Sequence, residues 1–243
     1  MRLEGKKALI TGASRGLGRA IATTFAKEGA DLALHARTVE ALAGTAEEVQ
    51  GAGRQAHCIA WDIADSSQVE ERMAEARNAL GGLDILVNNA GVLRLPPDDP
   101  GTTLESNYDY VMDINLKALY LLSEAAVKMM REQKSGVIIN IASDAGMRGA
   151  PVPYGISKWG VIGYTRGLAQ RVAKDGIRVN GIGPGPIATT MVGCEDGKPK
   201  DWPAGPLGRF ALLEEVADVA LFLASDDSRA VFGHTIPLNT ANP

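Results

Sequence analysis

The sequence is poor in the residues that metal centres and disulfide scaffolds need. Its 243 residues include two cysteines, Cys58 and Cys194, and three histidines, His35, His57 and His234. The two thiols are far apart in the chain and stand in no metal-ligand spacing, and the histidines form no HExxH-type pair. We therefore expect no metal centre and no disulfide framework. Two lone thiols are typical of a protein from a reducing compartment.

Long apolar runs and a large net charge are lacking as well. No hydrophobic stretch approaches the length that spans a bilayer, and residues 1–7 lack the apolar core of a signal peptide. The formal net charge of −4 gives no basic surface for nucleic acid or for an anionic membrane. We expect a cytoplasmic protein that binds neither nucleic acid nor a membrane.

Short apolar runs of strand length alternate with amphipathic segments along the whole chain. Such alternation is typical of a parallel sheet covered on both faces. We predict a single-domain α/β fold over residues 1–243, a Rossmann-type doubly wound parallel sheet of about seven strands with helices on both faces. Residues 184–210 are rich in Gly and Pro and have no period, so we predict a mobile loop on the substrate side there. The predicted strands are 7–11, 31–36, 56–61, 83–87, 137–141, 177–182 and 234–238, and the predicted helices after the first are 39–50, 66–80, 107–132, 154–174 and 213–224.

A glycine-rich turn separates the first predicted strand from the first predicted helix. It reads Gly12-Ala13-Ser14-Arg15-Gly16-Leu17-Gly18, a looser relative of the G-x-G-x-x-G fingerprint. Without a Cβ the backbone turns sharply and approaches a pyrophosphate, while the following helix offers free N–H groups and the positive end of its dipole. A plain glycine turn is the alternative, but the position between strand and helix favours dinucleotide binding.

The choice of dinucleotide is predicted about twenty residues further on, at the end of the second strand. There the chain has His35-Ala36-Arg37 and no carboxylate to bind a ribose 2′-hydroxyl. Arg37, together with Arg15 inside the turn, favours a 2′-phosphate, because a guanidinium pairs with phosphate in a bidentate manner. We predict NADP(H) as the cofactor. The alternative is that Arg37 is a solvated residue at the start of a helix.

A tyrosine and a lysine stand four residues apart, at Tyr154 and Lys158. On a helix such a pair shares one face, and a neighbouring ammonium favours the phenolate. A phenol tuned toward neutral pH can serve as a general acid or base at a carbonyl or alcohol oxygen. Ser143, just after the predicted strand 137–141, can donate a second hydrogen bond to that oxygen. The pair alone is weak evidence, since Lys is abundant.

Taken together, the motifs resemble those of the short-chain dehydrogenase/reductase family over essentially the whole chain. Each motif is weak alone, but the order and the elements on which they stand are highly specific. The matching residues are Thr11-Gly12-x-x-x-Gly16-x-Gly18, Asp62-Ile63, Asn88-Asn89-Ala90-Gly91, Asn115, Ser143, Tyr154-x-x-x-Lys158 and Pro184-Gly185.

The resemblance implies a role for each matching residue. Tyr154 would be the proton donor or acceptor and Ser143 would polarise the substrate oxygen. Lys158 would lower the pKa of Tyr154 and bind the nicotinamide ribose, and Asn115 would hold a water relay to Lys158. The residues implied to bind the cofactor are Gly12, Ser14, Arg15, Gly16, Leu17, Gly18, Arg37, Asp62, Ile63, Asn89, Ala90, Gly91, Tyr154, Lys158, Pro184, Gly185, Ile187 and Thr189.

The resemblance implies an NADP(H)-dependent oxidoreductase that transfers a hydride between the cofactor and a small carbonyl or alcohol substrate, such as a ketone, a sugar or a polyol. A second interpretation is reduction of 3-oxoacyl thioesters on a carrier protein or coenzyme A. Lys134 could attract an anionic carrier, but Asp175 stands where such relatives often have a second basic residue. A third is a cofactor-sensing protein without turnover, which need not have kept the matching catalytic set.

Three further expectations concern the surroundings of the site. Trp159 and Tyr164 lie on the helix that relatives use to pair subunits, so we expect a homo-oligomer, a dimer or a tetramer; core packing is the alternative for both aromatics. Asp144 is expected to hydrogen-bond a polyol or a loop N–H. The residues expected on the pocket rim are Arg94, Met147, Arg148 and Trp202.

Overall fold

The computed structural model describes residues 1–94, 101–196, 198 and 200–239. They form one sheet in the order β3-β2-β1-β4-β5-β6-β7, and every pair of neighbouring strands is parallel. The predicted doubly wound sheet is confirmed. Its strands are β1 (Lys7–Ile10), β2 (Asp31–Ala36), β3 (Ala56–Ala60), β4 (Ile85–Asn88), β5 (Gly136–Ile141), β6 (Ile177–Pro184) and β7 (Thr235–Leu238).

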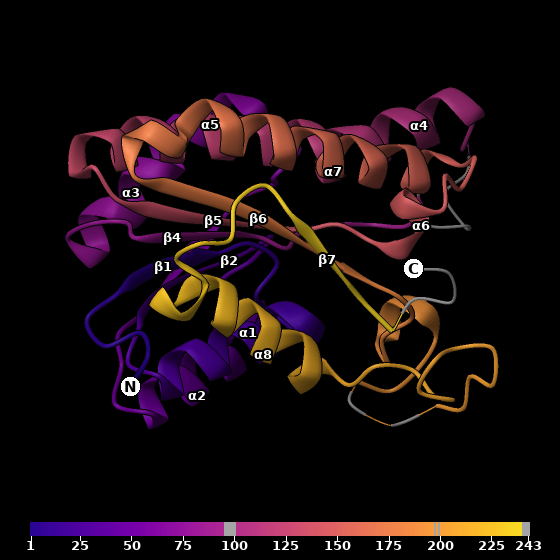
Figure 1. The fold of residues 1–243 in the computed structure, drawn as a ribbon, viewed down its shortest axis with the longest axis horizontal. Coiled ribbons are helices and arrows are strands. Elements are labelled where there is room, and N and C mark those ends of the chain that lie inside the picture. Colours follow the sequence, from indigo (N-terminus) through magenta and orange to yellow (C-terminus); the bar gives the residue numbers. More distant parts are fainter. Residues whose placement is uncertain (95–100, 197, 199, 240–243) are drawn as a thin grey trace.

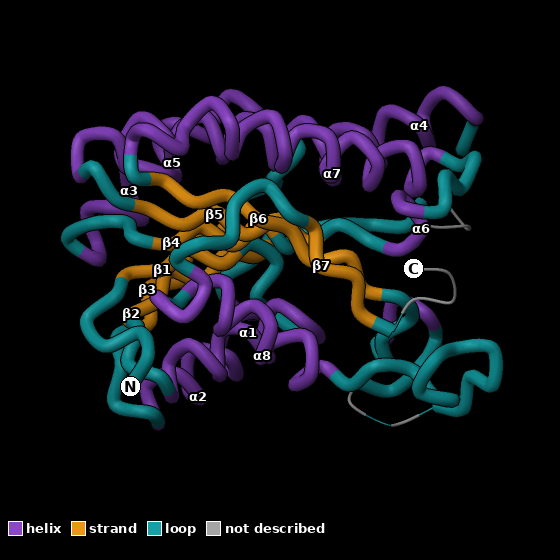
Figure 2. The backbone as a smooth tube through the Cα atoms, viewed as in Figure 1, coloured by secondary structure: helices purple, strands orange, loops and turns teal. Residues whose placement is uncertain are grey.

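Helices cover both faces of the sheet (Figure 1). In the tube view, α1, α2 and α8 lie below the strands, while α3, α4, α5 and α7 lie above them (Figure 2). None of the helices in the described ranges is long and apolar enough to cross a membrane. The helices are α1 (Gly16–Lys27), α2 (Ala43–Gly51), α3 (Val69–Leu80), α4 (Leu104–Met112), α5 (Ala118–Gln133), α6 (Asp144–Met147), α7 (Pro153–Val172) and α8 (Leu213–Ala224).

The strand order reverses at β1, which pairs with β2 on one side and with β4 on the other. Open sheets of this kind bind ligands in the crevice outside the carboxyl ends of the strands at such a reversal. Successive side chains of a strand point to opposite faces, so each strand feeds two cores. Leu9 packs into the core on the α3 and α5 side, whereas Ile10 packs into the core on the α1 and α8 side.

A chain of buried side-chain amides ties two helices to the middle of the sheet. Asn88 Nδ2 of β4 donates hydrogen bonds to Ser123 Oγ of α5 at 3.0 Å and to Asn140 Oδ1 of β5 at 2.9 Å. Asn140 Nδ2 in turn donates to Thr165 Oγ1 of α7 at 2.9 Å. Buried polar groups cost free energy unless they are paired, so these bonds restrict how α5 and α7 sit on the strands.

Two local features differ from the sequence-based expectation. Residues 144–147 form a short helix, α6, where a loop was expected, and Ser143 caps it by accepting a hydrogen bond from the Ala145 N–H at 3.2 Å. The single long helix expected over 107–132 begins at Leu104 and is interrupted by a π-helical turn, Asp113–Lys117, before α5 continues. π-turns often mark functional sites, and this one carries Asn115.

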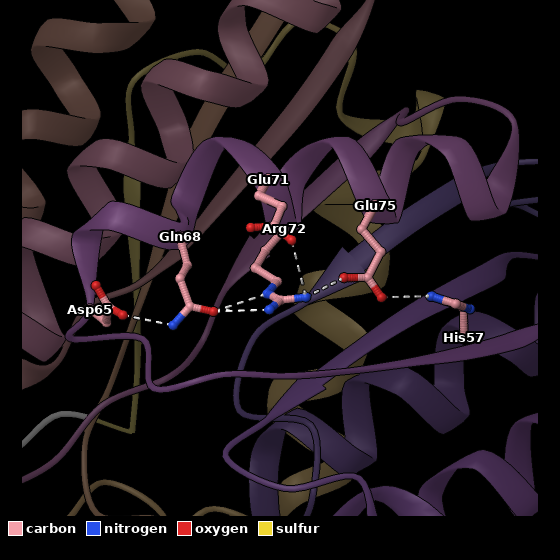
Figure 3. A network of polar contacts seen from close by, with 6 residues as sticks. All are labelled: His57, Asp65, Gln68, Glu71, Arg72 and Glu75. Atoms are coloured by element: carbon pink, nitrogen blue, oxygen red, sulfur yellow. Dashed lines mark hydrogen bonds and ion pairs between the residues drawn. The ribbon is translucent and has the colours of Figure 1, made fainter.

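A row of polar side chains runs along α3 and reaches His57 of the neighbouring strand β3 (Figure 3). Arg72 Nη1 donates to Glu75 at 2.9 Å, and Glu75 Oε1 lies 3.2 Å from His57 Nε2 on β3. These groups are half exposed, and exposed ion pairs contribute little to stability. His57 therefore belongs to a network of half-exposed polar side chains, outside the cavity described below.

Candidate active site

A cavity of about 450 Å³ opens at the carboxyl ends of the strands, a volume typical of ligand sites. The segments that follow six of the seven strands contribute to its wall. The structure thus brings together almost every residue predicted for the site, while their roles remain predictions. The predicted residues that line the cavity are Gly12, Ser14, Arg15, Gly16, Leu17, Gly18, Arg37, Asp62, Ile63, Asn89, Ala90, Gly91, Ser143, Tyr154, Lys158, Pro184, Gly185, Ile187 and Thr189.

The glycine-rich turn forms one end of this cavity. Gly12 and Gly16 have φ values of +67° and +54°, in the left-handed region that favours glycine. A Cβ on Gly18 would lie 2.2 Å from the carbonyl oxygen of Gly12, so the helix could not start this close to the turn with any other residue. Helix α1 begins at Gly16, and its first N–H groups therefore face the cavity.

The turn after β4 is fastened to the glycine turn. Thr11 Oγ1 accepts hydrogen bonds from the N–H groups of Asn89 and Ala90, both at 3.0 Å. Asn89 Nδ2 donates to the carbonyl oxygens of Thr11 at 2.9 Å and Gly12 at 3.1 Å. Two loops that are 77 residues apart in sequence thus form one surface. These bonds give a structural reason for the presence of Thr11 and Asn89 in the motifs that resemble those of the family.

His35 is a cavity residue whose structural role the sequence did not indicate. It is 2 % exposed, and burial lowers its pKa to about 4, so the ring is neutral at pH 7. Nδ1 accepts a hydrogen bond from the Gly12 N–H at 3.2 Å. The proton must then sit on Nε2, which lies 3.2 Å from the Trp61 carbonyl oxygen and donates to it. His35 therefore supports the glycine turn from behind.

Arg15 and Arg37 both line the cavity and are exposed. Neither guanidinium takes part in an ion pair with another residue of the described ranges. Asp62, at the end of β3, accepts a hydrogen bond from the Ala64 N–H at 3.0 Å. Two cations without a carboxylate partner are consistent with the expectation of a phosphate-bearing ligand at this edge.

The residues expected to carry the chemistry lie at the other end of the cavity. Ser143 follows β5 by two residues, and Tyr154 is the second residue of α7, whose first residue is a proline. Lys158 is buried one turn further along, and its Nζ donates to the carbonyl oxygen of Ile141 at 2.7 Å. This Nζ lies 5.8 Å from the centroid of the Tyr154 ring.

The electrostatics of this group differ from the expectation that Lys158 lowers the pKa of Tyr154. Burial raises the pKa of the phenol above its usual value of 10.0; a hydrogen bond from Ser143 lowers it and the Asp144 carboxylate raises it. Burial also lowers the pKa of Lys158 to about 8. The i, i+4 spacing does bring Lys158 near Tyr154, but desolvation is the largest influence on the pKa of the phenol and raises it.

Asn115 lies behind the cavity wall and does not line it. Its Oδ1 accepts from the Val92 N–H at 2.8 Å, and its Nδ2 donates to the Val92 carbonyl at 2.9 Å and to Ser157 Oγ at 3.1 Å. A Cβ on Gly91 would lie 3.3 Å from Asn115 Oδ1 and 3.5 Å from Lys158 Nζ, so the two side chains approach the same stretch of backbone. The expected relay between them stays a prediction.

The residues expected on the rim do not line the cavity itself. The lining contains Leu93, Met191 and Val192 in place of the expected rim residues. Asp144 does line the cavity, but its carboxylate binds neighbouring side chains, Ser143 and Arg148, rather than a loop N–H. The contact between Asp144 and Arg148 depends on α6, which brings the two residues onto one face and which no sequence pattern indicated. The expected residues outside the lining are Arg94, Met147, Arg148 and Trp202.

A carboxylate from the segment after β6 reaches the glycine turn. Asp196 Oδ2 accepts a hydrogen bond from the Gly16 N–H at 3.1 Å, and its Oδ1 accepts from the Thr190 N–H at 2.8 Å. An anion therefore sits on the first amide of α1, where helix N-termini bind phosphate. The turn accepts a negative group in the geometry observed, and the residues present fit a pyrophosphate. Nothing in the sequence around Asp196 signalled this contact.

Comparisons with known proteins agree with this site. A family model described as short chain dehydrogenase matches residues 6–198. The 3-oxoacyl-(acyl-carrier-protein) reductase of Thermotoga maritima is 38 % identical over 244 residues, which cover 98 % of both chains. The Staphylococcus aureus protein of the same name is 37 % identical and covers 96 % of both. The crystal structure of levodione reductase is 32 % identical, with a TM-score of 0.86, and the match covers 98 % of this chain and 97 % of that one.

We predict that Asp196→Asn strengthens dinucleotide binding. The carboxylate competes with a phosphate for the Gly16 N–H and repels it, whereas an Asn amide keeps an acceptor oxygen but carries no charge and so competes less strongly. The dissociation constant for NADPH, measured by titrating the cofactor fluorescence, should fall about threefold to tenfold at low salt.

Glu195→Gln is the matched control. Glu195 is paired with Lys198 at 2.6 Å, so this substitution removes the same charge without changing a contact to the glycine turn. If the Asp196→Asn variant binds NADPH no more tightly than the Glu195→Gln variant, Asp196 does not compete with a cofactor phosphate for the Gly16 N–H.

Proposed function

The chain belongs to the short-chain dehydrogenase family, and from that premise we propose that it is an NADP(H)-dependent reductase of 3-oxoacyl thioesters. The observation that carries the chemistry is the convergence of Ser143, Tyr154 and Lys158 at one end of a cavity whose other end is a glycine turn. The substrate class is supported by the names of the curated relatives, which match nearly the whole chain.

The protonation of the site favours reduction over oxidation. A raised pKa keeps the Tyr154 phenol protonated at pH 7, which is the form that donates a proton to a carbonyl oxygen. Ser143, whose hydroxyl lies in the same cavity wall, donates a hydrogen bond to that oxygen and stabilises the negative charge that develops on it. Lys158, charged below about pH 8, adds a buried positive charge behind the phenol.

A bound nicotinamide would supply the hydride that reduces the carbonyl carbon. The residues that would hold the cofactor are those of the glycine turn at the phosphates, Asp62 and Ile63 at the adenine, and Ile187 and Thr189 beside the nicotinamide. Arg15 and Arg37 support a 2′-phosphate at the adenosine ribose, because they are exposed cations at the cavity edge and no carboxylate follows β2.

Two wider features belong to the same proposal. Residues 184–210 would form a mobile cover over the substrate, since the described residues of this segment lead from the cavity wall toward α8 and contain little regular structure. Trp159 is 62 % exposed on α7, which argues against core packing for it and supports a homo-oligomer, a dimer or a tetramer.

A second candidate is reduction of a free ketone or oxidation of an alcohol or polyol. Asp175 accepts a hydrogen bond from Arg131 Nε at 2.7 Å and so neutralises a cation near Lys134. This pairing weakens the basic surface that would attract an acidic carrier protein. Levodione reductase, whose fold matches over nearly its whole length, is named for a reaction without a carrier.

The substrate is tested by following NADPH oxidation at 340 nm with acetoacetyl-coenzyme A, an acetoacetyl carrier protein, simple ketones and sugars. The proposal predicts activity on the thioesters, and activity on ketones or sugars alone would establish the second candidate. Tyr154→Phe should lower kcat about 10²- to 10⁴-fold, because it removes the transferable proton. A Phe variant with full activity, or a wild-type protein that turns over no substrate, would contradict the enzyme assignment.

We predict that Arg37→Asp shifts cofactor preference from NADPH toward NADH. The change removes a guanidinium and places a carboxylate where it repels a 2′-phosphate and accepts from a 2′-hydroxyl. The ratio of kcat/KM for the two cofactors should change at least about tenfold, a difference of 1.4 kcal/mol.

Arg229→Asp is the control, since Arg229 is exposed beside the amino-terminal ends of the strands and its replacement changes the net charge equally. Equal ratios in the two variants would refute the assignment of Arg37.

A further inference from the structure

The hydroxyl of Ser143 has two neighbours within its own segment. Its Oγ accepts a hydrogen bond from the Ala145 N–H at 3.2 Å and donates one to Asp144 Oδ1 at 3.3 Å. A serine hydroxyl carries one proton. While that proton points to Asp144, it cannot point to the Tyr154 phenol, with which Ser143 also forms a hydrogen bond, or to the oxygen of a substrate in the cavity. The Asp144 carboxylate thus binds the Ser143 hydroxyl, which the proposed chemistry needs as a hydrogen-bond donor to the substrate.

Asp144 is a buried carboxylate, and among the described residues it forms an ion pair with Arg148 alone. The residue is 7 % exposed, and its Oδ2 accepts a hydrogen bond from Arg148 Nε at 3.1 Å. The Arg148 side chain is 46 % exposed, so the ion pair runs from the cavity wall to the solvent. Both residues belong to the single turn around α6, at the i and i+4 positions, which keeps them together.

Two charged side chains face the phenol of Tyr154 from different elements. Asp144 approaches from α6 and raises the pKa of the phenol, and Lys158 lies one turn along α7 with Nζ 5.8 Å from the ring. Arg148 stands behind Asp144 and offsets its negative charge. Burial sets the direction of the pKa shift of the phenol, and the Asp144 carboxylate, which is paired with Arg148, adds to it.

We propose that Asp144 and Arg148 form a positioning pair for the two catalytic hydroxyls, Asp144 directing the proton of Ser143 and Arg148 limiting the negative charge that Tyr154 meets. The pair touches no reacting atom. Ser143 turns its proton to the substrate oxygen only when that oxygen outcompetes the Asp144 carboxylate. The inference rests on the proposed role of Tyr154 in proton transfer.

The test is the pH dependence of alcohol oxidation with NADP⁺, in which the phenolate form of Tyr154 accepts the proton. In wild type, kcat/KM rises with pH and levels off above the pKa of the phenol. Asp144→Asn keeps the size of the side chain and removes its charge, so the midpoint should fall by about half a pH unit or more. Arg148→Gln leaves the negative charge of Asp144 without its ion-pair partner, so the midpoint of the pH profile should rise by a similar amount.

Arg148→Lys restores the positive charge and should return the midpoint to that of wild type. A purely structural role predicts lower activity in both neutral variants at an unchanged midpoint. Unchanged midpoints, or shifts of the same sign for Asp144→Asn and Arg148→Gln, would overturn the proposal.

A second readout needs no turnover and separates this inference from the proposed function. Phenolate absorbance at 295 nm is titrated in each variant with and without Tyr154→Phe, and the difference gives the titration of Tyr154 alone. Opposite shifts in a protein that turns over no substrate would leave the positioning pair established and the enzyme assignment refuted. An active enzyme whose Tyr154 titrates identically in all variants would refute the pair alone.

Discussion

The hydrogen bond from Lys158 Nζ to the carbonyl oxygen of Ile141 joins α7 to the end of a central strand, and the candidate site depends on it. Ile141 is the last residue of β5, Ser143 follows two residues later, and Tyr154 lies one helical turn before Lys158. One buried bond therefore sets the separation of all three groups. A buried ammonium is stable only with such a partner, because desolvation strongly disfavours the charged form.

The remainder of the fold keeps this bond in place. The buried amides of Asn88 and Asn140 anchor α5 and α7 to neighbouring strands, so the helix that carries Lys158 cannot slide along the sheet without leaving polar groups unpaired. At the other end of the cavity, the fastening of Asn89 to Thr11 and of Gly12 to His35 gives the cofactor side comparable rigidity. A cavity with two rigid ends, joined by the less regular segment between β6 and α8, is suited to holding two reactants in one orientation.

The sequence predicted the fold, and it named residues that the structure gathers around one cavity, because both results depend on local patterns. Alternation of apolar runs located all seven strands, and glycine spacing located the turn. What failed depends on tertiary contacts. Spacing put Lys158 beside Tyr154 correctly, but the sign of the pKa shift of the phenol follows from burial, which spacing does not contain. The helix at 144–147, the π-turn around Asn115 and the reach of Asp196 to Gly16 also had no sequence signal.

The most direct test of this account is the titration of Lys158 itself by NMR of selectively labelled lysine side chains, assigned with Lys158→Met. Because burial disfavours the ammonium, the account predicts that Lys158 titrates at about 8 in the folded protein, against 10.5 for an ordinary lysine. By linkage, the stability of wild type relative to Lys158→Met should rise between pH 8 and 10.5 and be lost again as the pH falls. A Lys158 that titrates near 10.5 with the exposed lysines would contradict the desolvation of its ammonium in the site.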